Sequence, residues 1–296
     1  MSRILFVKEG VAVWSSHLDL MRALMRSFRR AGIDLKHSQG FTPHPELSIL
    51  MPLSVGVESQ CEIAEFTLAE GCELPASELA ARMNPVLPAG IRAIESYEGG
   101  QKAGKLAWLR ARLALEYEGS GIKDQGSGDA RTSNARPYGA QNDRVEALRA
   151  LFARPSLIVE KHSKKGDVEL DIAPMIRSCS VGAAEPSPAC RGGGPASRPV
   201  EGCRPQPAEG SEMQNAECRM QNEGTGDART SDARPYGAQN DSGETVVLEA
   251  VVAAQNPTLN PLLLVTAIEK YLPEHKPDFV QCRRLEIYDA DMNVFR

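Results

Sequence analysis

Residues 1–31, MSRILFVKEGVAVWSSHLDLMRALMRSFRRA, place a short apolar segment before a long amphipathic one. Residues 3–8 are apolar and rich in branched side chains, which predicts a β-strand. Residues 15–31 repeat apolar side chains at helical spacing, which predicts an α-helix. The chain therefore is predicted to begin with a β-strand followed by an amphipathic α-helix.

The predicted helix has a signal at each end and two different faces. The Ser16 hydroxyl can cap the first turn, and the carboxylate of Asp19, three residues later, can form the reciprocal hydrogen bond. Gly32 can end the helix. At about 100° per residue, one arc is apolar and is expected to face the core: Leu18, Met21, Leu24, Met25 and Phe28. The other arc holds Asp19 and a basic row: Arg22, Arg26, Arg29 and Arg30.

The rest of the first hundred residues continues this order of elements. Strands are predicted over Ser48–Val55 and Glu62–Ala69, a helix over Ala76–Met83 and a last strand over Ile91–Tyr97. The resulting order, βαββαβ, is typical of a ferredoxin-like domain. We therefore predict one such domain over residues 1–100.

Residues 101–296 repeat the order without repeating the sequence. The predicted elements are a strand at Leu106–Tyr117, a helix at Asp143–Ala153, a hairpin of Leu157–His162 with Asp167–Ile172, a strand at Thr245–Ala253, a helix at Pro261–Tyr271 and a strand at Phe279–Tyr288. The second hairpin strand either neighbours the 245–253 strand or is replaced by it in the sheet. The predicted fold class is α+β, with two tandem ferredoxin-like domains.

Two stretches of the second domain have no apolar periodicity. Residues 128–143, GDARTSNARPYGAQND, return at 226–241 with one residue changed, while their flanks do not match. Such polar, Gly-rich segments cannot build a core. We predict that disordered low-complexity insertions interrupt this domain near 119–142 and 177–243.

Composition excludes several classes of protein. The 34 Lys and Arg against 39 Asp and Glu exclude nucleic-acid binding through bulk positive charge. No run of about 18 apolar residues occurs, and the amino terminus carries charges where a signal peptide is apolar, so we expect a cytoplasmic protein with no membrane contact. The seven cysteines lie too far apart for a metal motif and are interpreted as reduced thiols.

Charge is nevertheless uneven along the first domain. Residues 1–45 carry seven basic and three acidic side chains, whereas residues 46–100 carry two basic and nine acidic ones. The basic row on the helix has no interleaved glutamates for pairing four residues apart, which favours an anionic or acidic partner. The alternative is that the basic row is simply the solvent-exposed face of the helix and binds no partner.

The segment 36–45, KHSQGFTPHP, gathers two histidines, an aromatic ring and a stiff Pro-x-Pro. Such a loop can hold a phosphate or stack a base. The alternative is a structural loop in which Gly40 supplies a positive φ and Phe41 packs on the core. The predicted contacts with nucleic acid or a partner are Arg22, Arg26, Arg29, Arg30, Lys36, His37, Gln39, Phe41 and His44.

Three histidines, His17, His37 and His44, are the candidate catalytic residues, because an imidazole can act as a general acid or base. His17 on the first helical turn can instead be a satisfied capping residue. With Asp19, the three could hold a metal only if the loop folded back on the helix start, which the spacing does not require. No metal and no cofactor are therefore predicted, and no Walker, Rossmann, GxSxG, HExxH or three-cysteine motif is present.

Several motifs in fixed order closely resemble the radical-SAM-linked protein family: SHLD at 16–19, RRAG at 29–32, SQGFTPHP at 38–45 and PLSVGVES at 52–59, followed by Glu62. That bacterial family has no known function and is encoded beside, or fused to, a cobalamin-type radical SAM protein. The resemblance covers the first hundred residues well and the second half loosely. It implies a radical SAM protein as partner. His44 lies where other basic residues are accepted, which favours a charge contact over catalysis.

These observations predict a non-catalytic accessory module that binds RNA, tRNA or rRNA, or docks an acidic partner surface. One alternative is an enzyme, since tandem ferredoxin-like domains also build metal-independent CRISPR repeat-processing endoribonucleases, in which a histidine acts on the RNA 2′-hydroxyl. Those enzymes are similar to this chain in predicted fold only, and their Gly-rich loop near the carboxyl terminus is missing here. The other alternative is a purely protein-binding scaffold.

Overall fold

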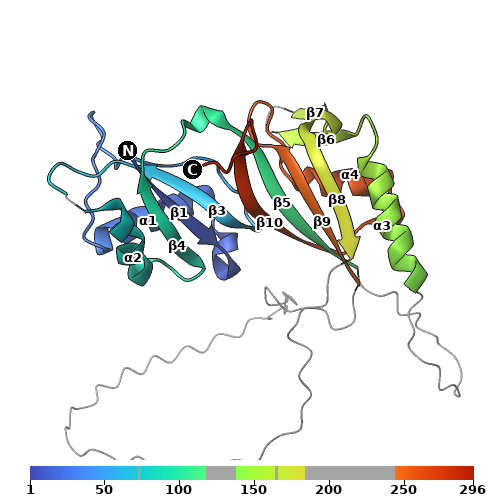
Figure 1. Cartoon of the computed structure of the whole chain (residues 1–296), viewed down its shortest axis with the longest axis horizontal. Helices are drawn as coiled ribbons and strands as arrows, with labels where there is room; N and C mark the ends of the chain where they lie inside the picture. The colour runs from blue at the N-terminus through green and yellow to red at the C-terminus, as the bar shows by residue number, and fades with distance from the viewer. Residues whose placement is uncertain (73, 118–137, 164–165, 184–243) are drawn as a thin grey trace, which may run out of the picture. The chain divides into compact units, whose positions relative to one another are not determined.

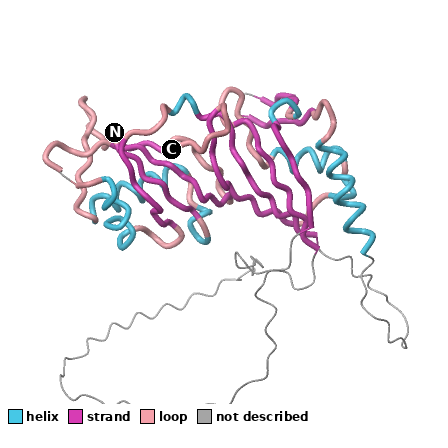
Figure 2. The backbone as a smooth tube through the Cα atoms, in the orientation of Figure 1, coloured by secondary structure: helices cyan, strands magenta, loops and turns pink. Residues whose placement is uncertain are grey.

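The computed structural model describes residues 1–72, 74–117, 138–163, 166–183 and 244–296. These residues form a mixed α+β protein with a large mixed sheet and four α-helices (Figures 1 and 2). None of the helices in these ranges is long and apolar enough to cross a membrane. The α+β class predicted from the sequence is confirmed.

The first half contains β1 (Ser2–Lys8), α1 (His17–Arg30), β2 (Leu47–Ile49), β3 (Val57–Phe66), α2 (Ala76–Met83) and β4 (Ile91–Glu98). Its strands lie in the order β4-β1-β3-β2, and each neighbouring pair is antiparallel. The two helices and the sheet share an apolar core, in which the rings of Phe28 and Phe66 lie 4.8 Å apart between centroids. This core holds α1 firmly and leaves its other side free for contacts.

The second half contains β5 (Leu106–Tyr117), α3 (Tyr138–Phe152), β6 (Ile158–Ser163), β7 (Gly166–Asp171), β8 (Ile176–Ala183), β9 (Glu244–Ala253), α4 (Leu263–Tyr271) and β10 (Phe279–Asp289). Its order is β10-β5-β9-β8, while β6 and β7 form a separate two-stranded sheet. The predicted hairpin is therefore present but lies outside the large sheet. The strand beside β9 is β8, which the sequence reasoning missed.

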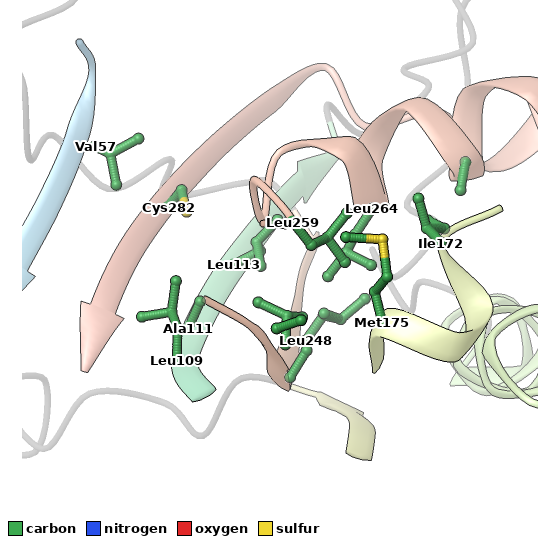
Figure 3. Close-up of a cluster of buried hydrophobic side chains, with 14 of the residues drawn as sticks. Val57, Leu109, Ala111, Leu113, Ile172, Met175, Leu248, Leu259, Leu264 and Cys282 are labelled. Carbon is green, nitrogen blue, oxygen red and sulfur yellow. The ribbon is translucent and has the colours of Figure 1, made fainter. Parts of the chain in front are cut away.

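Alternating side chains of β5 build the core of this half. Leu109, Ala111 and Leu113 are buried, whereas Arg110 and Arg112 between them are exposed. Figure 3 shows the buried set beside Leu248 and other apolar side chains of the same cluster. This period of two is what a sheet with one covered face requires.

One short parallel pairing joins the two halves into a single sheet. Residues 282–284 of β10 pair with residues 57–59 of β3. Beside this pairing, the Arg284 guanidinium donates to Glu62 Oε1 at 2.7 Å, and both side chains are buried. The predicted division into domains 1–100 and 101–296 falls between β4 and β5, and it stays a prediction.

Three predicted boundaries are wrong. The strand expected over 48–55 covers only Leu47–Ile49, because Met51 and Pro52 turn away and give their carbonyls to Arg284. The insertion expected from Arg177 overlaps β8, a polar edge strand that buries only Val181 and so lacks an apolar signal. The insertion expected to end at residue 142 overlaps α3, which begins at Tyr138. The remainder of both predicted insertions lies outside the described residues.

The buried face of α1 also differs from the predicted one. Leu24 and Phe28 are buried as expected and Met21 and Met25 are partly covered, but Leu18 is 62% exposed. Leu20 and Ser27 take its place: Leu20 packs in the core, and the Ser27 hydroxyl donates to the Val86 carbonyl at 3.2 Å. The prediction failed because a helix face was chosen from apolar side chains alone, and a bonded serine was not counted.

Candidate functional site

Helix α1 is fixed at both ends by the residues that the sequence pointed to. The Asp19 N–H donates to Ser16 Oγ at 3.2 Å, and the Ser16 hydroxyl donates to the Asp19 carboxylate at 2.6 Å. This hydrogen bond is the main reason why the pKa of Asp19 lies below its usual value. At the other end Gly32 adopts φ +66°, and the Ile33 N–H donates to the Phe28 carbonyl at 3.0 Å. The helix therefore presents its outer face rigidly.

That outer face carries the predicted basic row, and all four arginines are exposed. Arg22 pairs with Asp19 at 3.2 Å, but both side chains are about 60% exposed, so water screens the pair. Within the described parts of the chain, Arg26, Arg29 and Arg30 make no ion pair. Proximity to the negative end of the helix dipole stabilises the last two. Arg26 has no such partner and leaves its charge available to a ligand.

The 36–45 loop folds as a narrow, hydrogen-bonded turn. The Ser38 N–H donates to the His44 carbonyl at 2.8 Å, and the Glu46 N–H donates to the Lys36 carbonyl at 2.7 Å. Phe41 stands in the turn with its side chain fully exposed, at 106% of the reference area. The structural-loop alternative is wrong on both points, because Gly40 does not have a positive φ and Phe41 does not pack on the core.

The basic row and the loop meet at one pocket of about 370 Å³. Arg22, Arg26 and Arg29 line it from α1, and His37 lines it from the loop. The remaining lining residues are Met25, Phe28, Ile33, Asp34, Leu35, Pro43 and Pro45. The other predicted contacts are exposed but do not line this pocket: Arg30, Lys36, Gln39, Phe41 and His44.

The three candidate histidines do not share one site. His37 lines the pocket, and its Nδ1 donates to the Leu35 carbonyl at 3.0 Å, which leaves Nε2 for a ligand. His44 Nδ1 lies 2.9 Å from Ser38 Oγ, so this ring holds the loop together. His17 is not the satisfied capping residue of the alternative interpretation, because its buried Nδ1 has no partner among the described residues. In the same ranges, no three His, Cys, Asp or Glu side chains could hold a metal ion.

Other ionisable side chains are buried at the junction of the two halves, away from the pocket. The Lys8 ammonium donates to the carbonyls of Val13 and Ser15, and burial lowers its pKa. Burial also raises the pKa of the Cys61 and Cys282 thiols to about 12, so neither is a thiolate at neutral pH. These groups lie where the elements of the two halves meet.

Sequence reasoning missed several residues that bear on function. Asp34 lines the pocket, and the Arg82 guanidinium donates to the Ala31 carbonyl at 2.9 Å, adding a cation at the end of α1. Arg82 is 51 residues away in sequence, so no local pattern could have found it. A set of exposed apolar side chains was also missed: Val11, Trp14, Leu18 and Val55.

Comparison with protein families identifies a match for this chain. A family model described as "Uncharacterized protein conserved in bacteria (DUF2344)" matches residues 2–198. The matched span includes α1, the 36–45 loop and the whole pocket. Among curated proteins, none matches the chain.

Proposed function

Because the chain belongs to the bacterial family DUF2344, whose description names no activity, we propose a function from the surface of the chain itself. It is a non-catalytic accessory module of a cobalamin-type radical SAM enzyme, and it binds RNA, tRNA or rRNA, through α1 and the 36–45 loop. RNA binding and the radical SAM partner rest on separate observations.

The observation that carries RNA binding is the meeting of the basic row and the loop at one pocket. Arg22, Arg26 and Arg29 lie at positions i, i+4 and i+7 of a helix, so their guanidinium groups follow one line on its surface. A phosphate backbone is a line of negative charges, and guanidinium groups bind phosphate through paired hydrogen bonds. The arrangement therefore supports contact with several successive phosphates.

Phe41 favours RNA over a simple acidic surface. Its side chain is fully exposed in the loop that meets the basic row, so its ring is open to a stacking partner. Unpaired RNA bases stack on such rings, and each stacked base contributes about 1–3 kcal/mol.

The radical SAM partner is supported by the resemblance and by a second surface. Trp14 lies against the turn at Gly56, where an added Cβ would be 3.6 Å from the indole ring, and Val55 beside it is 51% exposed. These two exposed apolar side chains suit a protein contact better than a phosphate backbone, and Val11 and Leu18, from the same part of the sequence as Trp14, are also exposed. We assign this surface to the radical SAM protein. A pure protein-binding scaffold is the second candidate function, and this surface is the observation that favours it.

The tandem of ferredoxin-like domains belongs to the same proposal. The first half has the order β4-β1-β3-β2 and the second has β10-β5-β9-β8, so the two halves repeat one arrangement with the β6–β7 hairpin added. This repetition supports two ferredoxin-like units that join where β10 pairs with residues 57–59 of β3, beyond the part of β3 that β2 covers.

Crosslinking in bacterial cells tests the proposed function. The tagged full chain is irradiated and purified under denaturing conditions, beside a variant with Arg22→Gln, Arg26→Gln and Arg29→Gln. We expect crosslinked RNA with the natural chain and several-fold less with the variant. Recovery of proteins alone would favour the scaffold and contradict RNA binding. Equal amounts of RNA with both chains would contradict RNA binding through Arg22, Arg26 and Arg29.

A further inference from the structure

Among the residues lining the pocket, one is acidic. Asp34 lines the pocket together with Arg22, Arg26 and Arg29, and its carboxylate forms no ion pair with any side chain in the described ranges. Its backbone is fixed, because the Ala69 N–H donates to the Asp34 carbonyl at 2.9 Å. A pocket built only for phosphate would gain nothing from a carboxylate, which repels that ligand.

The pocket floor points to a ring rather than to a phosphate. Phe28, Ile33 and Leu35 are buried beneath it, and Pro43 and Pro45 stand at its side. Its volume of about 370 Å³ is within the range of small-ligand pockets. An apolar floor with a few polar groups at the rim suits a flat heterocycle, whose faces are apolar and whose edge is polar.

We propose that this pocket receives one unpaired guanine of the bound RNA, which rests on the proposed function and names the ligand more closely. The base lies on the apolar floor, its N1–H and its N2 amino group both donate to the Asp34 carboxylate, and its neighbouring phosphates lie on the arginines. His37 lines the same pocket, and its Nδ1 bond to the Leu35 carbonyl leaves Nε2 for a ligand.

The chemistry of the carboxylate selects guanine. An ionised carboxylate only accepts hydrogen bonds, and it has two oxygens to fill. Guanine presents two adjacent donors on its Watson–Crick edge, whereas adenine and cytosine present an amino group beside an acceptor nitrogen, and uracil presents one donor between two carbonyls. Because base pairing covers this edge, the guanine must be in a loop, a bulge or a single strand.

Equilibrium binding of the full chain to short fluorescent RNAs tests the proposal. The probes are single-stranded 12-mers of uridine with one central guanosine, inosine, adenosine or cytidine, together with the guanosine probe annealed to its complement. Inosine is the closest comparison, since it differs from guanosine only in lacking the N2 amino group. We expect the guanosine strand to bind about tenfold more tightly than the adenosine, cytidine and duplex probes, with inosine between them.

Asp34→Asn is the informative variant, with Glu70→Gln as its control, because Glu70 is an exposed acid outside the pocket. Asp34→Asn should reduce the preference for guanosine to about twofold or less and leave the mean affinity equal or higher, since a negative charge is lost. Glu70→Gln should keep the full preference. A circular-dichroism melt of each variant verifies that both are folded.

The outcomes separate the two proposals. Equal binding of all four single strands by the natural chain would overturn the guanine pocket and leave RNA binding standing. No binding of any RNA would overturn both. Millimolar guanosine monophosphate provides the last comparison: if it binds in an Asp34-dependent manner while the RNAs do not, the pocket serves a free nucleotide, and its assignment to RNA is wrong.

Discussion

Phe41 is the side chain whose exposure most needs a partner. It lies between the hydrogen-bonded residues Ser38 and His44 and touches no core residue, so its removal should not disturb folding. We expect Phe41→Ala to change the free energy of unfolding by less than about 0.5 kcal/mol. The same change should weaken binding of single-stranded RNA by about 1–3 kcal/mol, because one stacked base is lost.

Two assays on Phe41→Ala, urea unfolding and RNA titration, verify this expectation. Phe41→Trp serves as the matched variant, since it keeps a stacking ring of larger area and should bind at least as well as the natural chain. If Phe41→Ala lost stability instead of affinity, the ring would be a packing residue after all.

The candidate histidines separate a binding module from a nuclease. An essential general acid or base contributes about 10²- to 10⁴-fold in rate, so a nuclease would lose cleavage when that one histidine became alanine. A binding module should leave end-labelled tRNA intact in EDTA. Each of His17→Ala, His37→Ala and His44→Ala should then cost at most about 1 kcal/mol of affinity. Discrete cleavage products that disappear in a single variant would overturn the accessory role.

Helix α1 depends on a cap that can be removed without touching the basic face. Ser16→Ala deletes the hydroxyl that accepts from the Asp19 N–H and also frees the Asp19 carboxylate. The loss in unfolding free energy should be about 1 kcal/mol. Because the pKa of Asp19 is lowered in the folded chain, its contribution is present above the unfolded pKa and disappears as pH falls through the folded value.

Unfolding of the natural chain and Ser16→Ala at pH 7 and at about pH 3 measures both effects. The difference between the two chains should narrow at the lower pH, because protonation of Asp19 weakens the Ser16–Asp19 hydrogen bond in the natural chain, whereas Ser16→Ala has no such bond to lose. A constant difference across this range would mean that the carboxylate takes no part in the cap.

Prediction from sequence succeeded for elements with local signals. Ser16 and Gly32 marked the ends of α1 through their own chemistry, and the apolar alternation of residues 106–117 marked β5. It failed where a distant residue decides the outcome. β8 has few apolar side chains and is a strand because β9 pairs with it.

The same distinction holds at the pocket. The basic row could be predicted from helical spacing, and the 36–45 loop was a candidate because of its two histidines, its aromatic ring and its Pro-x-Pro. That they line one pocket depends on how the chain returns from α1 to β2, which local patterns do not specify. Asp34 was missed because a single acidic residue after four arginines is expected simply to balance part of their charge.

Two neighbouring ion pairs join the halves of the molecule. Arg284–Glu62 is buried, and Arg283–Glu58 is partly exposed. Removing one partner of a buried pair leaves an uncompensated charge, so Arg284→Met should cost about 3–5 kcal/mol of unfolding free energy. Arg283→Met is the matched control. The Arg283 side chain is 41% exposed and that of its partner Glu58 is 10% exposed, so water screens this pair in part and Arg283→Met should cost less than Arg284→Met.

Urea unfolding of both variants and of the double variant Glu62→Gln with Arg284→Met completes this experiment. Removing both buried charges should restore part of the lost stability. Equal losses for Arg283→Met and Arg284→Met would show that the buried pair has no special part in joining β3 to β10.

The salt dependence of RNA binding by the whole chain tests the central claim most directly. The affinity of a single-stranded RNA is measured from about 50 to 300 mM salt for three chains. One is natural, one carries Arg22→Gln, Arg26→Gln and Arg29→Gln, and one carries three exposed control changes outside the pocket: Arg92→Gln, Lys102→Gln and Lys105→Gln. The natural chain and both variants must unfold cooperatively at similar temperatures for their affinities to be compared.

Each phosphate contact adds about 0.7 to the slope of log affinity against log salt for a single strand. The pocket variant should therefore bind more weakly and lose about two units of slope, while the control variant keeps nearly the natural slope. An unchanged affinity and slope in the pocket variant, or an equal loss in the control, would contradict RNA binding through α1 and the 36–45 loop.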